Sequence, residues 1–486
     1  MLRLKWIFIY IFSLSVIISA CYKEDFYTGN DFELRFSSDT LTFDTVFTSR
    51  GSATRILKVY NDRDKPVRIS EIRIASNKNN QFRLNIDGIS SNSAKDVEIG
   101  AKDSIYLFAE THINPDDPLS VSPFIVTDSL IFKTNEVEQK VTLLAWGQNA
   151  NYINTKEIGK LSCNLGEIIW DDPRPYIIYG ILRIDSCTLT LPPGTRVHMH
   201  GGINRDNAGN FYYDGNIYVY KKGKLNIEGS AEKPVIIQTD RLEKEYQDIN
   251  AQWYGIFILP ESKGNKIQHA EIRNATIALY VDSLAAVDMK FTKILHAGAW
   301  GLYSRHATVN AENCLFADIG SYNVIIDYGG NVNMTYCTIY NNNSDDALVL
   351  KNYRCLDKNC SSIDPYPLNA KLTNCIIYGS DSDELLLSDG NKQDPVFFKY
   401  SFENCLVQVK DILKQNQFPY FFDNCVSCLN GKGDENLFLD TEKYDYRPDT
   451  MAIVIDKGKY LSGINRDIDF NLRDANPDIG CYEFQK

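Results

Sequence analysis

Two acidic pairs, Asp345-Asp346 and Asp383-Glu384, are the residues whose type and spacing best fit chemistry in this sequence. They occupy the same position in two copies of a repeat, so four carboxylates are expected on neighbouring turns of the chain. Carboxylates that close repel one another unless solvent or a cation screens them, and Ca²⁺ takes several oxygen ligands. The sequence therefore predicts either a calcium site or a solvated polar turn.

Aromatic and cationic residues gather a short distance before these acids, at Trp300, Tyr303, Arg305 and His306. Aromatic surfaces with a few well-placed polar groups are typical of ligand sites, and this combination suits a sugar. The alternative is that these residues simply mark a turn of the chain.

Other catalytic signatures are weak. His198 and His200 alternate on an expected strand, but they lack a third ligand, which favours a surface or turn position over a zinc site. A glycosidase needs two carboxylates about 5 Å or roughly 6.5–9.5 Å apart, which sequence cannot supply. No motif identifies a base for a lyase, and no Ser-His-Asp triad, P-loop or dinucleotide fingerprint occurs in its proper context.

The short strands that must position these residues recur as a repeat in the sequence. Five cysteines each begin a short apolar strand and follow Asn, or in one case Tyr: Cys314, Cys337, Cys375, Cys405 and Cys425. The first two lie 23 residues apart, and the next interval, from Cys337 to Cys375, is longer by an apparent insertion over 353–367. A period of about 20 to 25 residues with short strands and Asn, Asp and Gly turns is typical of a solenoid.

A parallel β-helix follows from this repeat. Equivalent residues of successive coils should stack about 4.8 Å apart, so the cysteines form an inward ladder and the preceding residues a ladder of turns. Such a column of thiols does not surround a metal. Cys355 and Cys360, inside the insertion, are candidates for a small disulfide loop in an oxidising compartment, with two free thiols as the alternative. The Cys425–Cys428 pair is not favoured as a metal site.

The N-terminus has the pattern of a lipoprotein signal peptide over 1–20, with a basic start, an apolar run and small residues before Cys21. Cys21 is the predicted lipidation site and 21–29 a short tether; an uncleaved anchor helix is the alternative. Tyr22 to Asp25 resembles the charged signal that sends Bacteroidetes lipoproteins to the outer face of the outer membrane. That resemblance implies a surface-exposed lipoprotein attached to the membrane through lipid.

Residues 30–150 contain short alternating strands separated by turn residues, which predicts a β-sandwich. The stretch resembles the immunoglobulin-like modules often found before β-helices. Its expected role is to hold the following domain away from the lipid and to cover that domain's first coil, since an open solenoid end exposes strand edges.

From Asn151 the chain resembles the exported right-handed β-helix proteins of the pectate-lyase-like class, through Thr188–Thr195, Lys224–Ser230, Pro234–Ile237, Trp253–Ile256 and Arg473–Phe484. The resemblance implies an all-β chain with a right-handed parallel β-helix over 151–430 and a closing segment over 431–486. Lyases of this fold use carboxylate clusters with Ca²⁺ to neutralise a uronate carboxyl group.

The composition narrows the function. The net charge is −12, and the predicted leader removes Arg3 and Lys5, so nucleic acid is a poor partner. The first hypothesis is a cell-surface lipoprotein whose non-catalytic β-helix binds carbohydrate or another envelope component. The alternatives are a polysaccharide lyase or glycoside hydrolase, and a structural or adhesive module with a protein partner. No cofactor is indicated other than the Ca²⁺ of the acidic pairs.

Overall fold

A computed structural model divides the chain into two compact units, Met1–Asn149 and Ala150–Lys486. It describes residues 25–29, 31, 33–47, 54–77, 80–112, 124–154, 160–205, 209, 211–343, 345–390, 396–414, 418, 421–433 and 435–485. The predicted signal peptide and Cys21 lie outside these residues. Within the described residues, no helix is long and apolar enough to cross a membrane.

The first unit is a β-sandwich of two five-stranded sheets. One contains β1 (Arg35–Phe36), β3 (Arg55–Tyr60), β8 (Ser104–Thr111), β5 (Phe82–Ile86) and β6 (Ile89–Ser90); the other contains β2 (Thr40–Phe47), β10 (Val137–Gln148), β9 (Phe124–Thr134), β4 (Val67–Ile74) and β7 (Ser93–Ile99). Alternate residues such as Phe82, Leu84 and Ile86 are buried in one core between the sheets. Its immunoglobulin-like kinship stays a prediction.

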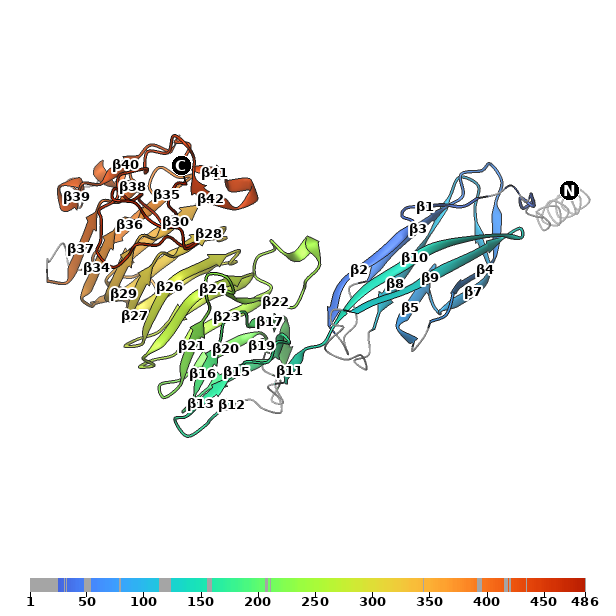
Figure 1. Ribbon diagram of the computed structural model, residues 1–486, viewed down its shortest axis with the longest axis horizontal. Coiled ribbons are helices and arrows are strands. Elements are labelled where there is room, and N and C mark those ends of the chain that lie inside the picture. Colours follow the sequence, from blue (N-terminus) through green and yellow to red (C-terminus); the bar gives the residue numbers. More distant parts are fainter. Residues whose placement is uncertain are drawn as a thin grey trace, which may run out of the picture. The chain divides into compact units, whose positions relative to one another are not determined.

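The second unit confirms the all-β class and the β-helix-like solenoid. Its main sheet has 26 strands that pair in parallel from coil to coil (Figure 1). The pairings trace three parallel sheets along the solenoid, and its core side chains point inward from all three.

The first sheet contains β12 (Lys160–Leu161), β15 (Ile181–Ile184), β20 (Asn216–Val219), β23 (Trp253–Ile258), β25 (Ala275–Val281), the first halves of β27 (Trp300–Glu312) and β29 (Val324–Thr335), β31 (Leu348–Lys351) and β36 (Leu385–Ser388). The second contains β13 (Glu167–Ile169), β16 (Thr188–Leu191), β21 (Lys224–Glu228), the first halves of β24 (Asn265–Arg273) and β26 (Ala286–Leu295), the second halves of β27 and β29, β34 (Leu368–Thr373), β37 (Phe398–Glu403) and β39 (Cys425–Val426).

The third sheet contains β11 (Asn151–Asn154), β14 (Tyr176–Tyr179), β17 (Arg196–His200), β22 (Val235–Thr239), the second halves of β24 and β26, β28 (Leu315–Ala317), β30 (Thr338–Asn341), β35 (Ile376–Gly379), β38 (Leu406–Gln408) and β40 (Leu429–Gly431). Three hairpins project from the coils: β18 (Ile203–Arg205) with β19 (Phe211–Tyr213), β32 (Tyr353–Cys355) with β33 (Ile363–Pro365), and β41 (Phe438–Asp440) with β42 (Asp445–Pro448). The described helices are 3₁₀ turns: η3 (Lys244–Tyr246), η4 (Ile412–Lys414), η5 (Phe421–Asn424) and η6 (Thr441–Lys443).

The cysteine column lies between the second and third sheets. Cys314, Cys337, Cys375 and Cys405 are buried in the solenoid core, and Cys425 in the last coil is half-buried. Each buried thiol points to the backbone carbonyl two residues earlier, as in the 3.4 Å contact from Cys375 Sγ to Thr373 O. These residues pack as small apolar side chains with a local hydrogen-bond partner.

The residues before these cysteines turn the chain. Asn313, Asn374 and Asn404 have φ angles of 51°, 56° and 49°, in the left-handed region that asparagine tolerates. Their amide groups donate to the carbonyls of Arg466, Lys459 and Lys457 at 3.0, 2.8 and 2.9 Å. The turn ladder therefore also fastens a distant segment of the chain.

That segment is the C-terminal one. It runs along the outer face of the third sheet, where Val454, Ile479 and Cys481 pack on Leu315, Ile376 and other outward side chains of that sheet. The predicted closing segment over 431–486 thus covers a side of the solenoid, which keeps the third sheet's apolar outer face out of water.

A buried ion pair holds this segment. Arg473 and Glu483 lie 3.1 Å apart with side chains only 2% and 5% exposed. Arg473 also donates to Asn313 Oδ1 at 2.7 Å and to the carbonyl of Gly480 at 2.9 Å, and its guanidinium lies over the Tyr336 ring. The pair therefore joins the C-terminal segment to the coil turns.

We expect Arg473→Met to destabilise the C-terminal segment by about 3 kcal/mol or more, because Glu483 would be left buried without its partner. Hydrogen exchange over residues 457–483 should become roughly 100-fold faster. The control is Arg447→Met, which removes the ion pair between Arg447 and Asp445. Their side chains are 57% and 25% exposed, so this change should lower the stability by about 1 kcal/mol or less. Equal effects of the two changes would contradict this account.

Candidate functional site

The outer face of the first sheet presents one side chain from each coil in the same column. Tyr280, Tyr303 and Ile325 are direct partners across β25, β27 and β29. Their neighbours Leu279 and Leu302 are buried in the core, so the alternation of the strand turns these residues outward. The parallel register thus gathers residues that are one coil apart in the sequence.

Aromatic rings form a continuous series that starts on the β18–β19 hairpin and runs onto this face, which we call the aromatic row: Tyr213, Tyr254, Phe257, Tyr280, Tyr303 and Trp300. Successive ring centroids are 4.7, 5.3, 5.7, 5.2 and 4.6 Å apart. Tyr213 is exposed, and Tyr254, Tyr280, Tyr303 and Trp300 are half-buried, so the row remains accessible along its edge. Two of the predicted sugar-contact residues, Trp300 and Tyr303, therefore end a longer aromatic surface.

Charged groups flank the row two residues further along the strands. The Tyr303 hydroxyl donates to Asp327 at 2.6 Å, and Lys351 pairs with the same carboxylate at 3.0 Å. Arg305 lies directly opposite Asp327 in the register. Burial and the bond to Asp327 raise the pKa of Tyr303 well above its usual range, so its phenol stays protonated at neutral pH. This flank offers hydrogen bonds and charges beside the rings.

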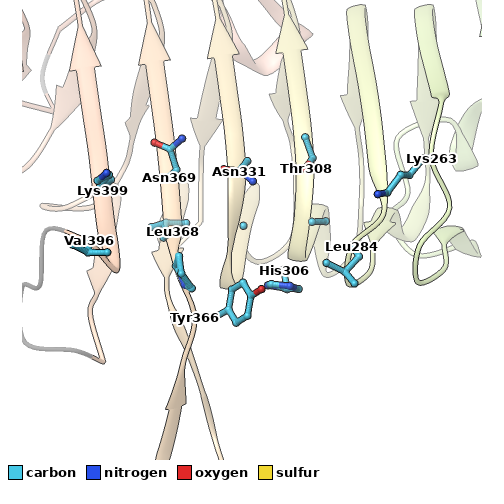
Figure 2. A pocket seen from close by; sticks show the side chains of 13 residues that line it. Lys263, Leu284, His306, Thr308, Asn331, Tyr366, Leu368, Asn369, Val396 and Lys399 are labelled. Atoms are coloured by element: carbon cyan, nitrogen blue, oxygen red, sulfur yellow. The ribbon is translucent and has the colours of Figure 1, made fainter.

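The structure separates His306 from the other predicted sugar-contact residues. His306 lies at the turn after the first sheet, with φ of 50°, and its ring meets Tyr366 edge-on at 3.5 Å. Burial lowers the pKa of His306, so the imidazole is neutral at neutral pH. It lines a cavity of about 510 Å³ on the second sheet (Figure 2).

Three of the four predicted carboxylates accept hydrogen bonds, each from different partners. Asp383 accepts hydrogen bonds from the backbone N–H groups of Lys410, Asp411 and Ile412, which anchors the start of η4. Asp345 accepts one from the Ser321 hydroxyl at 2.6 Å.

Glu384 is buried and accepts from the N–H groups of Asp381 and Ala347 at 2.8 and 3.1 Å. Burial raises its pKa to about 8. Asp346 differs, because it is half-buried and its pKa is raised to about 6 by burial and then by the charges of Asp345, Asp383 and Asp381.

The calcium site expected at these four carboxylates stays a prediction. No three His, Cys, Asp or Glu side chains among the described residues are grouped so that they could hold a metal ion. Glu384 accepts from backbone N–H groups inside the protein, and Asp383 accepts from those at the start of η4.

The two histidines on β17 also act separately. The Nδ1 atom of His198 lies 3.0 Å from the Thr239 carbonyl, and burial lowers the pKa of His198 to about 4. The Nδ1 atom of His200 lies 2.7 Å from Asp240. Each ring thus serves a local contact.

Disulfides fix two parts of the solenoid. One joins Cys355 and Cys360 in the β32–β33 hairpin, and a second joins Cys163 and Cys187 in the first coils. The second was missed by sequence reasoning, although its separation of 24 residues is close to one coil and could have indicated stacked neighbours. Tyr280, Asp327 and Lys351 were missed as well, and extending the repeat along the strands would have found them.

Comparisons with known proteins add little to this geometry. No family model and no curated protein matches the chain. Among solved structures, the chain is similar to a protein of unknown function from Porphyromonas gingivalis W83, with 11% identity over 28% of this chain and 59% of that chain and a TM-score of 0.18. It is also similar to a family 123 glycoside hydrolase from Clostridium perfringens, with 8% identity, 39% and 48% coverage and a TM-score of 0.19.

A third similar structure is the catalytic unit of a GH87 alpha-1,3-glucanase from Streptomyces thermodiastaticus strain HF3-3, with 9% identity, 72% and 73% coverage and a TM-score of 0.26. The chain spans only about half the length of the first two structures. At these TM-scores none of the likenesses carries an argument about activity.

The raised pKa of Asp346 predicts a pH dependence. The folded chain binds this proton more tightly than the unfolded chain, so stability should fall as the pH rises from the ordinary value of 3.8 through about 6. Asp346→Asn should therefore raise the thermal midpoint above that of the wild type at pH 7.5, and the difference should vanish below pH 4. Circular dichroism melts across this range measure it.

The control is Asp411→Asn, which removes an exposed carboxylate that pairs with Lys414. This change should not raise the midpoint at pH 7.5. An Asp346→Asn variant with the wild-type midpoint at that pH would contradict the electrostatic account of the acidic pairs.

Proposed function

We propose that this protein binds an extended glycan along the aromatic row of its first sheet, without catalysing a reaction on it. The observation that carries the proposal is the unbroken series of six rings, next to the hydrogen-bonded group of Tyr303, Asp327 and Lys351. Rings supply apolar surface for the sugar's C–H faces, and the flank supplies donors and acceptors for its hydroxyls.

The chemistry beside the row supports binding rather than turnover. Tyr303 stays protonated and Asp327 is occupied by Tyr303 and Lys351, so neither is poised as a free general base. A rigid, pre-formed row also loses little conformational entropy when a ligand settles on it. These properties suit a surface that holds a polymer.

We further propose that the mature chain is lipidated at Cys21 and displayed at the outer membrane surface. The support is the sequence of the leader and of the charged residues after Cys21. Labelling with a radioactive fatty acid tests it: the wild type should incorporate label, and Cys21→Ser should not. Label in both forms, or in neither, would contradict the anchor.

For the binding site, we expect Trp300→Ala and Tyr303→Ala each to weaken glycan binding roughly 10-fold or more, as buried aromatic contacts at interfaces commonly do. The ligand is the oligosaccharide that gives the strongest signal for the soluble chain on a glycan array, and calorimetry measures its Kd. The control is Tyr460→Ala, which removes an aromatic ring that is 60% exposed and belongs to the C-terminal segment. Unchanged affinity in both row variants, with normal melting curves, would contradict the proposal.

A glycoside hydrolase or lyase is the second candidate, and Asp346 is the observation that favours it. Its raised pKa suits a general acid. Asp346 lies two residues before Leu348, which begins strand β31 of the first sheet, and Trp300 lies on the same sheet. Product release from neutral and acidic polysaccharides, with Ca²⁺ and with chelator, decides the matter. If the wild type releases products and Asp346→Asn does not, catalysis replaces the binding proposal. If the wild type shows no glycan binding and releases no products, the third candidate, a module with a protein partner, is favoured.

A further inference from the structure

A polar groove lies on the second sheet, whereas the aromatic row lies on the first. Its floor is a column of outward side chains on the second sheet, Thr308, Asn331, Asn369 and Lys399, which are direct partners in successive coils. Figure 2 shows these four residues in a line across the strands. Because neighbouring strands are about 4.8 Å apart, the line extends for roughly 14 Å, the reach of a short oligomer.

One wall of the groove is aromatic and rigid. The ring centroids of His306 and Tyr366 are 3.5 Å apart, and each lies 5.6 Å from the ring centroid of Tyr328. Tyr366 follows the β32–β33 hairpin, which is closed by the Cys355–Cys360 disulfide. The hairpin is fixed to the coil by a 2.6 Å hydrogen bond from the Tyr328 hydroxyl to Asp364. The insertion in the repeat therefore builds this wall.

The charge of the groove is opposite to that of the chain. Lys263 and Lys399 lie toward its two ends (Figure 2), and the described residues of its lining include no carboxylate. Within the described residues neither ammonium group has an ion-pair partner, whereas Lys290 on the same sheet pairs with Glu312 at 2.9 Å. Among the described residues, this chain of net charge −12 thus brings two positive charges to one groove with no carboxylate in its lining. Since a local positive field of this kind attracts anions, the ligand is expected to be negatively charged.

We propose that this groove binds a sulfated oligosaccharide. The aromatic wall suits the apolar face of a sugar ring, and the amides of Asn331 and Asn369 suit its hydroxyls. The described lining holds lysine and no arginine, so it lacks the bidentate fork that recognises planar carboxylates, while lysine acts as a point charge that fits a tetrahedral sulfate ester. His306 stays neutral at neutral pH, because burial lowers its pKa, so the two lysines supply the charge.

The proposal is tested by calorimetry with three probes of equal length: maltohexaose, sulfated maltohexaose and a hexamer of galacturonic acid. The wild type should bind sulfated maltohexaose most tightly, and high salt should weaken that binding. The double variant K263Q/K399Q should weaken it roughly 10-fold or more. Lys371→Gln is the matched control, because Lys371 is an exposed lysine on β34, two residues from Asn369 and outside the lining.

Three results would overturn the proposal: sulfated maltohexaose that binds no more tightly than maltohexaose, a double variant with wild-type affinity, or a Lys371→Gln variant that loses as much affinity as the double variant. Tighter binding of the galacturonate hexamer would overturn the choice of sulfate. Tyr366→Ala, checked by its melting curve, should weaken binding of the sulfated probe without changing its salt dependence. Trp300→Ala should leave this binding unchanged, which separates this groove from the aromatic row.

Discussion

In-register stacking of successive coils is the constraint on which the rest of this molecule depends. Each coil can bury its apolar side chains only against its neighbours, as Leu302, Val324 and Leu348 do in one core column of the first sheet. A shift of one residue between two coils would turn a core side chain outward and an outer one inward. The register is therefore held by the core, and it fixes everything that the outer faces carry.

The same register creates the surfaces to which we assign function. Tyr280 and Tyr303 are neighbours because their coils are aligned, and Thr308 and Asn331 are neighbours for the same reason. The insertion over 353–367 leaves the coil without disturbing this alignment, since β29 still pairs with β34 on its far side. An excursion of this kind can add a wall to a groove at little cost to the core.

The repeat made much of this organisation predictable. The interval between Cys314 and Cys337, and the asparagines before the cysteines, indicated the β-helix, its inward column and its turns. The repeat also predicted that Asp345-Asp346 and Asp383-Glu384 occupy equivalent positions. It could not show which groups donate hydrogen bonds to each carboxylate. A position in the repeat identifies the neighbours of a residue in adjacent coils, but it does not give the direction of the side chain.

The path of the C-terminal segment could not be predicted from the repeat either. It depends on contacts such as that between Arg473 and Asn313, which are 160 residues apart in the sequence. The wall made by Tyr366 and the pairing of Cys163 with Cys187 likewise come from tertiary neighbours that no local pattern reveals. Fold class is therefore readable from periodicity, whereas sites built where the period is broken are not.

The most direct test of this account is a crystal structure of the soluble chain with its strongest glycan-array ligand bound. The account predicts sugar density against the aromatic row, across β23, β25 and β27, with sugar hydroxyls near Asp327 and Lys351. A ligand that lies elsewhere, with the rings of Tyr280 and Tyr303 untouched, would contradict the claim that coil register builds the binding surface.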